Sequence, residues 1–189
     1  MVNMARISTA LAGLLLTTGC TNLGLLQTPP ETRQTLQGVQ KIGRCHMGGC
    51  TWFRIDDFAM IRETPDDAFL RVNVRWGSSS HPDGRMPNDR SRNVPIAWRP
   101  EIEEVYLYCT SRLPALIERE EDGSWQAARM DLVGTAGAME SSASLYAAVC
   151  HPGEDWRGEG FAARHGYRSV DGDFFIPLRR PDDILRQGR

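Results

Sequence analysis

The chain has almost no lysine and no surplus of charge of either sign. Lys41 is the only lysine among 22 basic residues, and the formal net charge of the 189-residue chain is -2. Proteins that bind nucleic acid through its phosphates carry a basic surplus, so the composition predicts no nucleic-acid partner. Because arginine replaces lysine almost throughout, we attribute the bias to codon usage rather than to chemistry.

The chain also lacks the motifs of the common enzyme classes. It contains no G-x-S-x-G elbow, H-E-x-x-H helix, Walker loop, G-x-G-x-x-G turn or S-x-x-K pair. His81 and His151 each precede a proline, which predicts loop positions, and a Cys–His dyad with His151 or His165 would need a free thiol. We therefore expect no catalytic residue, no metal ligand and no cofactor.

No hydrophobic run is long enough for a membrane-spanning helix. Residues 7–18 form the clearest run, 12 residues without a charge, whereas a helix that crosses a bilayer needs about 20. The run follows the positively charged Arg6. Together they match the positive n-region and the apolar h-region of a secretory signal.

The residues after this run, "TTGC" at 17–20, resemble the lipobox of bacterial lipoproteins. Small residues precede Cys20, although Thr17 stands where that pattern has leucine and Leu16 lies one place earlier. The resemblance covers only the first 20 residues. It implies a signal peptide over 1–19, a lipid with palmitate-type chains on Cys20, and firm anchoring, since each buried CH₂ contributes about 0.8 kcal/mol. By analogy with enteric lipoproteins, Thr21 implies the outer membrane, facing the periplasm. An ordinary secreted protein and an uncleaved short anchor remain alternatives.

Residues 20–40 are polar and contain Pro29-Pro30, which is typical of a tether. Residues 41–189 are then predicted to form a single globular domain.

Four cysteines remain in the domain, and in an oxidising envelope they predict two disulfides. Cys109 ends the strand-like "EVYLYC", and Cys150 ends a predicted helix that has a serine available as its cap. We therefore expect a Cys109–Cys150 bond and a local Cys45–Cys50 bond. Crossed pairings remain possible.

The stretch "CHMGGC" at 45–50 allows two other interpretations. Thiolate, thioether and imidazole are ligands that copper prefers, but a disulfide offers no thiolate. A thioredoxin-like redox pair needs two intervening residues, and here there are four. We prefer the structural disulfide.

The remaining pattern predicts an α+β domain: a mainly antiparallel sheet with one packed helix at about 140–150, held by disulfides. The stretch "FLRVNVRWG" at 69–77 alternates as a strand with one buried and one solvated face. Asp122-Gly123 marks a hairpin, "DFFIPL" a last strand, and the C-terminal residues at most one helical turn.

One long segment, residues 77–100, has no periodicity and exceeds the usual loop of about 4–6 residues. It contains the speculative binding residues, which are an aromatic and four arginines: Arg85, Arg90, Arg92, Trp98 and Arg99. Such a loop could contact an acidic partner, a phosphate or a glycan.

These observations favour a membrane-anchored envelope lipoprotein with a non-enzymatic binding or structural domain. Its partner would be another envelope protein or a glycan. Two alternatives stay open. The first is an inhibitor of a cell-wall-degrading enzyme that inserts the 77–100 loop into a catalytic cleft. The second is an envelope metal-binding protein or enzyme.

Overall fold

One curved antiparallel sheet forms the body of the structure, a computed structural model that describes residues 36–88, 91 and 93–188. Its strand order is β1-β2-β3-β5-β6-β7-β8, with β4 pairing to β3. The strands are β1 (Gln40–His46), β2 (Gly49–Glu63), β3 (Ala68–Ser80), β4 (Ala97–Trp98), β5 (Glu103–Cys109), β6 (Ala115–Arg119), β7 (Trp125–Arg129) and β8 (Phe175–Leu178).

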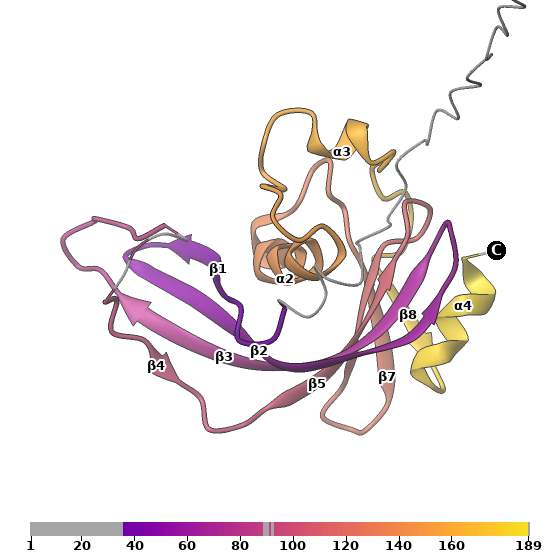
Figure 1. Cartoon of the computed structure of the whole chain (residues 1–189), viewed down its shortest axis with the longest axis horizontal. Helices are drawn as coiled ribbons and strands as arrows, with labels where there is room; N and C mark the ends of the chain where they lie inside the picture. Colours follow the sequence, from indigo (N-terminus) through magenta and orange to yellow (C-terminus); the bar gives the residue numbers. More distant parts are fainter. Residues whose placement is uncertain (1–35, 89–90, 92, 189) are drawn as a thin grey trace, which may run out of the picture.

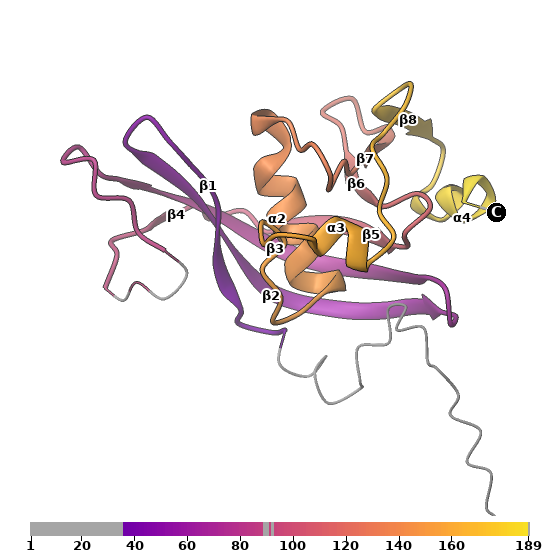
Figure 2. The same cartoon turned by 90° about the horizontal axis from the view of Figure 1, so that it is seen from above.

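The helices lie on both faces of this sheet. Helix α2 (Glu140–Cys150), preceded by the 3-10 turn η1 (Gly137–Met139), lies in the hollow of the curved sheet, and α3 (Phe161–Arg164) lies farther out (Figure 1). The C-terminal turn η2 (Pro181–Asp183) and α4 (Ile184–Gln187) lie at the opposite face. Figure 2 shows α2 crossing the strands beneath it. The predicted fold class, with one principal helix at 140–150, is confirmed.

Alternation along β3 builds the main core, as the sequence predicts. Leu70, Val72 and Val74 are buried, whereas Arg71, Asn73 and Arg75 are only partly covered. The buried face packs against α2. The predicted hairpin is also present: β6 pairs with β7, and the turn is closed by a hydrogen bond from the Glu120 amide to the Ser124 carbonyl.

The expectation of one solvated sheet face is wrong at one end of the sheet. Phe69 and Tyr108 point away from α2, yet both are buried, in a second core with Ile117, Leu178 and Ile184. Ile184 belongs to α4, so the C-terminal turn covers this face. The short terminal helix is therefore part of the fold and not a loose end.

The structure differs from the expectation at the start of the domain, at the ends of the 77–100 segment and at the N-cap of α2. Leu36 is 2% exposed and packs in the main core, so the fold includes residues 36–40, which the sequence assigned to the tether. Residues 77–80 continue β3 and residues 97–98 form β4, so both ends of the predicted long segment belong to the sheet. Among the described residues no side chain caps α2, and Met139 rather than a serine holds the N-cap position.

Candidate functional site

A cleft of about 790 Å³ lies between β1 and α2. The segment 153–157 after α2 forms a further wall, and Pro87 and Asn88 reach it from the loop after β3. Its lining includes basic, acidic and apolar side chains: Lys41, Ile42, Glu140, Ala147, Ala148, Glu154, Asp155, Trp156 and Arg157. A mixed lining of this kind suits a polar ligand or a peptide segment.

Strand β1 lines the cleft through Lys41, Ile42 and Cys45 and contains a bulge next to Ile42. The register shifts between Ile42 and Arg44, and the Gly43 carbonyl accepts hydrogen bonds from Ser144 Oγ and an Arg157 nitrogen, each at 2.8 Å. A Cβ added at position 43 would lie 2.9 Å from Ser141 Oγ. Glycine therefore allows β1 to approach α2 this closely.

Further contacts hold the cleft walls together. The Arg157 guanidinium lies 4.6 Å from the centre of the Trp156 ring, and Trp156 donates a hydrogen bond to Ser144 Oγ at 3.2 Å. Arg44 lies 3.4 Å from Glu140, the first residue of α2. These contacts join β1, α2 and the 153–157 segment and brace the walls of the cleft.

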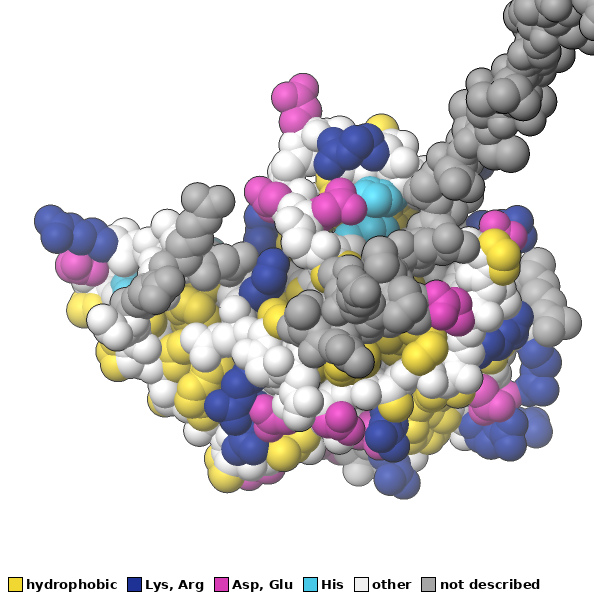
Figure 3. Space-filling view, in the orientation of Figure 1, with side chains coloured by type: hydrophobic (Ala, Val, Ile, Leu, Met, Phe, Trp, Pro, Cys, Tyr) yellow, Lys and Arg dark blue, Asp and Glu magenta, His cyan; other side chains and the backbone are white. Residues whose placement is uncertain are grey.

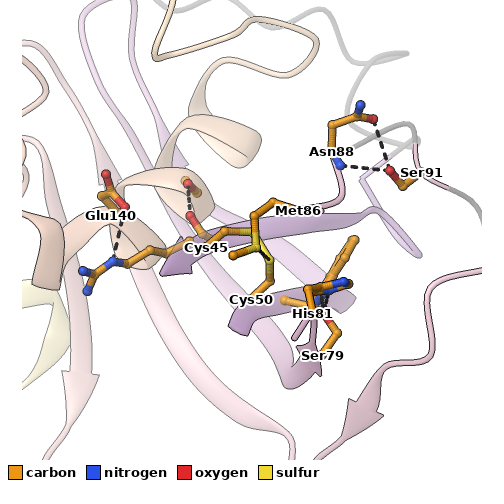
Figure 4. Close-up of a disulfide and its surroundings, with 12 residues drawn as sticks. Cys45, Cys50, Ser79, His81, Met86, Asn88, Ser91 and Glu140 are labelled. Atoms are coloured by element: carbon orange, nitrogen blue, oxygen red, sulfur yellow. Dashed lines mark hydrogen bonds and ion pairs between the residues drawn. A yellow bond between two sulfur atoms is a disulfide. The ribbon is translucent and has the colours of Figure 1, made fainter. Parts of the chain in front are cut away.

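The outer end of the cleft continues into a tip made by residues 45–50 and 81–88. The His81 amide donates to the Gly48 carbonyl at 2.6 Å, and Cys50 Sγ lies 3.9 Å from Met86 Sδ. Figure 4 shows Met86 beside the disulfide and His81 beside Ser79. Met47 and Arg85 are 90% and 91% exposed. The tip is therefore braced internally and presents two long side chains to solvent.

The disulfides have the predicted connectivity. Cys45 bonds to Cys50 across the β1–β2 hairpin, and Cys109 of β5 bonds to Cys150 at the end of α2. With both hairpin sulfurs joined, the stretch 45–50 offers no thiolate to a copper ion.

A second constellation follows α2 directly and comprises His151, Glu154 and His165, here called the histidine cluster. The sequence "HPGE" at 151–154 forms a tight turn, with Gly153 at φ 87° and the Glu154 amide donating to the His151 carbonyl. Proline followed by a glycine of positive φ is typical of such turns. The turn brings Glu154 back toward His151, and α3 delivers His165 to the same place.

The polar atoms of the cluster lie close together. His165 Nε2 is 3.0 Å from Glu154 Oε2, and His151 Nδ1 is 3.9 Å from Glu154 Oε1. The two imidazole rings are 4.0 Å apart between centroids. His151 is 4% exposed, whereas the side chains of Glu154 and His165 are 39% and 15% exposed. Histidine and acidic side chains meet at the surface over α3 (Figure 3).

Two tyrosines hold the far side of the buried imidazole. His151 Nε2 lies 2.5 Å from the Tyr167 hydroxyl, which is 3.2 Å from the Tyr146 hydroxyl. Tyr146 accepts a hydrogen bond from the Thr110 amide and reaches the Thr110 carbonyl at 3.4 Å. Phe161 packs edge-on against His151 at 5.1 Å. The orientation of His151 is thus set by β5, α2 and α3 together.

Burial controls protonation in this cluster. Burial, and next the proximity of His165, lowers the pKa of His151 to about 4, so its imidazole is neutral at neutral pH. Burial also raises the pKa of Tyr146 and Tyr167. For Glu154, burial acts to raise the pKa, but the hydrogen bond from His165 and the nearby basic side chains, Arg164 among them, lower it overall. Near neutral pH the cluster therefore holds one carboxylate beside a neutral, buried imidazole.

The described residues that the sequence proposed for binding each contact different neighbours and share none of the contacts below. Arg85 lies near Asp83 at the tip. Trp98 packs against the small buried cluster that contains Trp52 and lies under the Arg54 guanidinium. Arg99 lies 3.9 Å from Glu103. Arg90, Arg92 and the lipidation candidate Cys20 fall outside the described residues.

Sequence reasoning placed His151 in a loop and missed its association with His165. The signal that could have indicated it is "HPGE", because a proline–glycine turn places its first and fourth side chains near each other. His165 lies 14 positions after His151, and no local period connects them.

No protein-family model, curated protein sequence or solved structure matches this chain. Within the described ranges, none of the helices has both the length and the apolar character that a membrane crossing demands.

Proposed function

We propose that this chain is a lipid-anchored envelope protein of the outer membrane whose periplasmic domain has a binding rather than an enzymatic role. The observation that carries the proposal is the pairing of four cysteines into two disulfides, which leaves Cys20 as the one cysteine of the chain outside them. Disulfides persist in oxidising compartments. Cys20 is also the residue that the lipobox-like sequence assigns to the lipid.

The position of the domain along the chain fits this proposal. Residues 21–35 separate Cys20 from Leu36, the first described core residue. Fifteen residues span at most about 50 Å when fully extended. A lipid on Cys20 would therefore keep the cleft and the tip within reach of components at the membrane surface.

The anchor is tested with Cys20→Ser in the full-length precursor expressed in a bacterial host. The unaltered chain should incorporate labelled palmitate and sediment with membranes, and the variant should lose both properties. The double variant Cys45→Ser/Cys50→Ser removes two other cysteines and should retain acylation. Recovery of uncleaved, thiol-reduced precursor from the cytosol would refute the proposal.

We assign partner binding to the cleft, because its walls are braced by side-chain contacts and it is lined by side chains of both charges. A photo-crosslinking amino acid at Asp155, in the cleft wall, should yield a discrete adduct with one envelope component. The same probe at Asp66, an exposed residue of the β2–β3 turn, is the matched control and should give none. Identical adducts from both positions, or none from Asp155, would contradict the assignment.

The same experiment distinguishes partner binding at the cleft from the alternative function as an enzyme inhibitor. An inhibitor of a cell-wall-degrading enzyme would insert a protruding element into the catalytic cleft of its target, and the tip is braced and exposed. A probe at Met47 would then crosslink to such an enzyme while Asp155 would not.

A further inference from the structure

The histidine cluster combines three metal-ligand groups that come from two different segments. The ligand atoms of His151, Glu154 and His165 all lie within 4.8 Å of one another. Two imidazoles and one carboxylate form the ligand set of many three-residue zinc sites, which leave a fourth position open. We propose that His151, Glu154 and His165 bind a divalent transition-metal ion, and that this ion is zinc.

The hydrogen bonds behind His151 are those that a ligating histidine needs. Metal-bound histidines almost always donate their second ring N–H to an outer partner, which fixes the ring and its tautomer. Here Nε2 faces the Tyr167 hydroxyl at 2.5 Å. When Nε2 carries the proton, Tyr167 can donate to Tyr146, and Tyr146 can donate to the Thr110 carbonyl. This direction of the network leaves the lone pair on Nδ1, the nitrogen that faces Glu154.

The spacing of the three groups requires only a small closing movement. With Zn–N bonds of about 2.0–2.1 Å, tetrahedral ligand atoms lie about 3.3 Å apart. His165 and Glu154 are already 3.0 Å apart. Glu154 Oε1 is 3.9 Å from His151 Nδ1, which is too far for a hydrogen bond and somewhat longer than the tetrahedral separation. Because Glu154 and His165 are partly exposed, their side chains can adjust while the buried His151 stays fixed.

Charge and access also suit an ion at this position. The Glu154 carboxylate lies near both imidazoles and would add an oxygen ligand to the two nitrogens. Arg164 lies 3.8 Å from Glu154 and would compete with the metal ion for its carboxylate. The Arg164 side chain is 57% exposed, however, and can turn into solvent. Solvent reaches Glu154, so the fourth position would take a water molecule. Glu154 also lines the cleft, which places the ion at the cleft wall.

The purely structural interpretation explains less of this geometry. An ion pair between Glu154 and His165 accounts for one contact, and a buried hydrogen bond to Tyr167 accounts for another. Neither accounts for Nδ1 of a buried imidazole being directed at a carboxylate beyond hydrogen-bond distance. A zinc ion would connect these three groups directly.

The test is a zinc titration of the purified full chain, with both disulfides intact and without a histidine tag. We expect one zinc per chain by calorimetry and by metal analysis after dialysis. Glu154→Gln and His165→Gln should each weaken binding by at least about tenfold, and Tyr167→Phe, which removes no ligand, by about 10–100-fold. His46→Gln alters an exposed histidine of the tip and should bind zinc as the unaltered chain does.

A second measurement keeps the proposal testable if a variant folds poorly. In nitrogen-15 spectra of the histidine side chains of the unaltered chain, zinc should shift Nδ1 of His151 and Nε2 of His165 and leave His46 and His81 unchanged. The proposal is overturned by an absence of zinc binding, by binding that survives both Glu154→Gln and His165→Gln, or by shifts confined to His46 or His81.

Discussion

At the scale of single residues, Asp56 offsets a repulsion between two arginines on the outer face of the sheet. Arg54 and Arg75 are direct cross-strand partners, an arrangement that destabilises a sheet when the charges are alike. A bulge between Ile55 and Asp57 makes Asp56 the extra residue. Its carboxylate accepts hydrogen bonds from Arg54 at 2.7 Å and Arg75 at 3.1 Å. Burial acts to raise the pKa of Asp56, but both arginines outweigh it and hold the pKa below 3.8.

We predict that Asp56→Asn lowers the free energy of unfolding by about 1–2 kcal/mol at pH 7, measured by urea denaturation. Because the pKa of Asp56 is lower in the folded state than in the unfolded chain, its stabilisation is complete above pH 3.8. It is lost as the pH falls through the folded-state pKa. The difference between the two proteins should therefore shrink in acid. Asp57→Asn, at a side chain that is 55% exposed, is the control and should change stability by less than about 0.5 kcal/mol. Equal losses in the two variants would contradict the prediction.

At the scale of elements, the β1–β2 turn has a residue poorly suited to its backbone. Met47 has φ 47° and Gly48 has φ 80°, the pattern of a two-residue type I′ turn, for which Asn-Gly is preferred. A left-handed conformation costs an ordinary residue about 1–2 kcal/mol. The Met47 side chain is almost fully exposed, so packing offers little compensation.

Met47→Asn should therefore raise the free energy of unfolding by about 1 kcal/mol, seen as a higher urea midpoint with an unchanged slope. Gly48→Ala tests the same turn with a substitution that should lower the free energy of unfolding. Its Cβ would lie 3.3 Å from the His81 carbonyl oxygen at a positive φ, so it should destabilise the domain. A neutral or destabilising Met47→Asn would show that the turn is not strained by methionine.

Elements that depend on local pattern were predictable, and those that depend on distant contacts were not. Short stretches of sequence predicted three elements. Alternation predicted the strand β3, the dipeptide Asp122-Gly123 predicted the hairpin, and helical spacing predicted the helix at 140–150. Alternation along a strand cannot reveal that Ile184 of the C-terminal helix covers the face of the sheet that carries Phe69 and Tyr108. The histidine cluster likewise joins the residues after α2 to the end of α3 and has no local period.

At the scale of the whole molecule, α2 is enclosed between the sheet and the segment that follows it. Residues 143–150 are all buried, so the helix has partners on nearly every side. The Cys109–Cys150 bond joins its last residue to β5, and His151 follows immediately. The disulfide therefore fixes the point at which the histidine cluster begins, and the site depends on the integrity of the main core.

The two disulfides should contribute unequally to stability. In the chain-entropy model, closing the 41-residue separation of Cys109–Cys150 contributes about 4 kcal/mol, and the five-residue separation of Cys45–Cys50 about 2 kcal/mol. In urea unfolding, Cys109→Ala/Cys150→Ala should therefore lose more free energy of unfolding than Cys45→Ala/Cys50→Ala. Removing both partners avoids a free thiol, and the second variant serves as the control for the first. Since domains are stable by only about 5–15 kcal/mol, the first variant should be close to unfolding at 37 °C. The reverse order would mean that the braced tip, rather than the joint between α2 and the sheet, limits the stability of the fold.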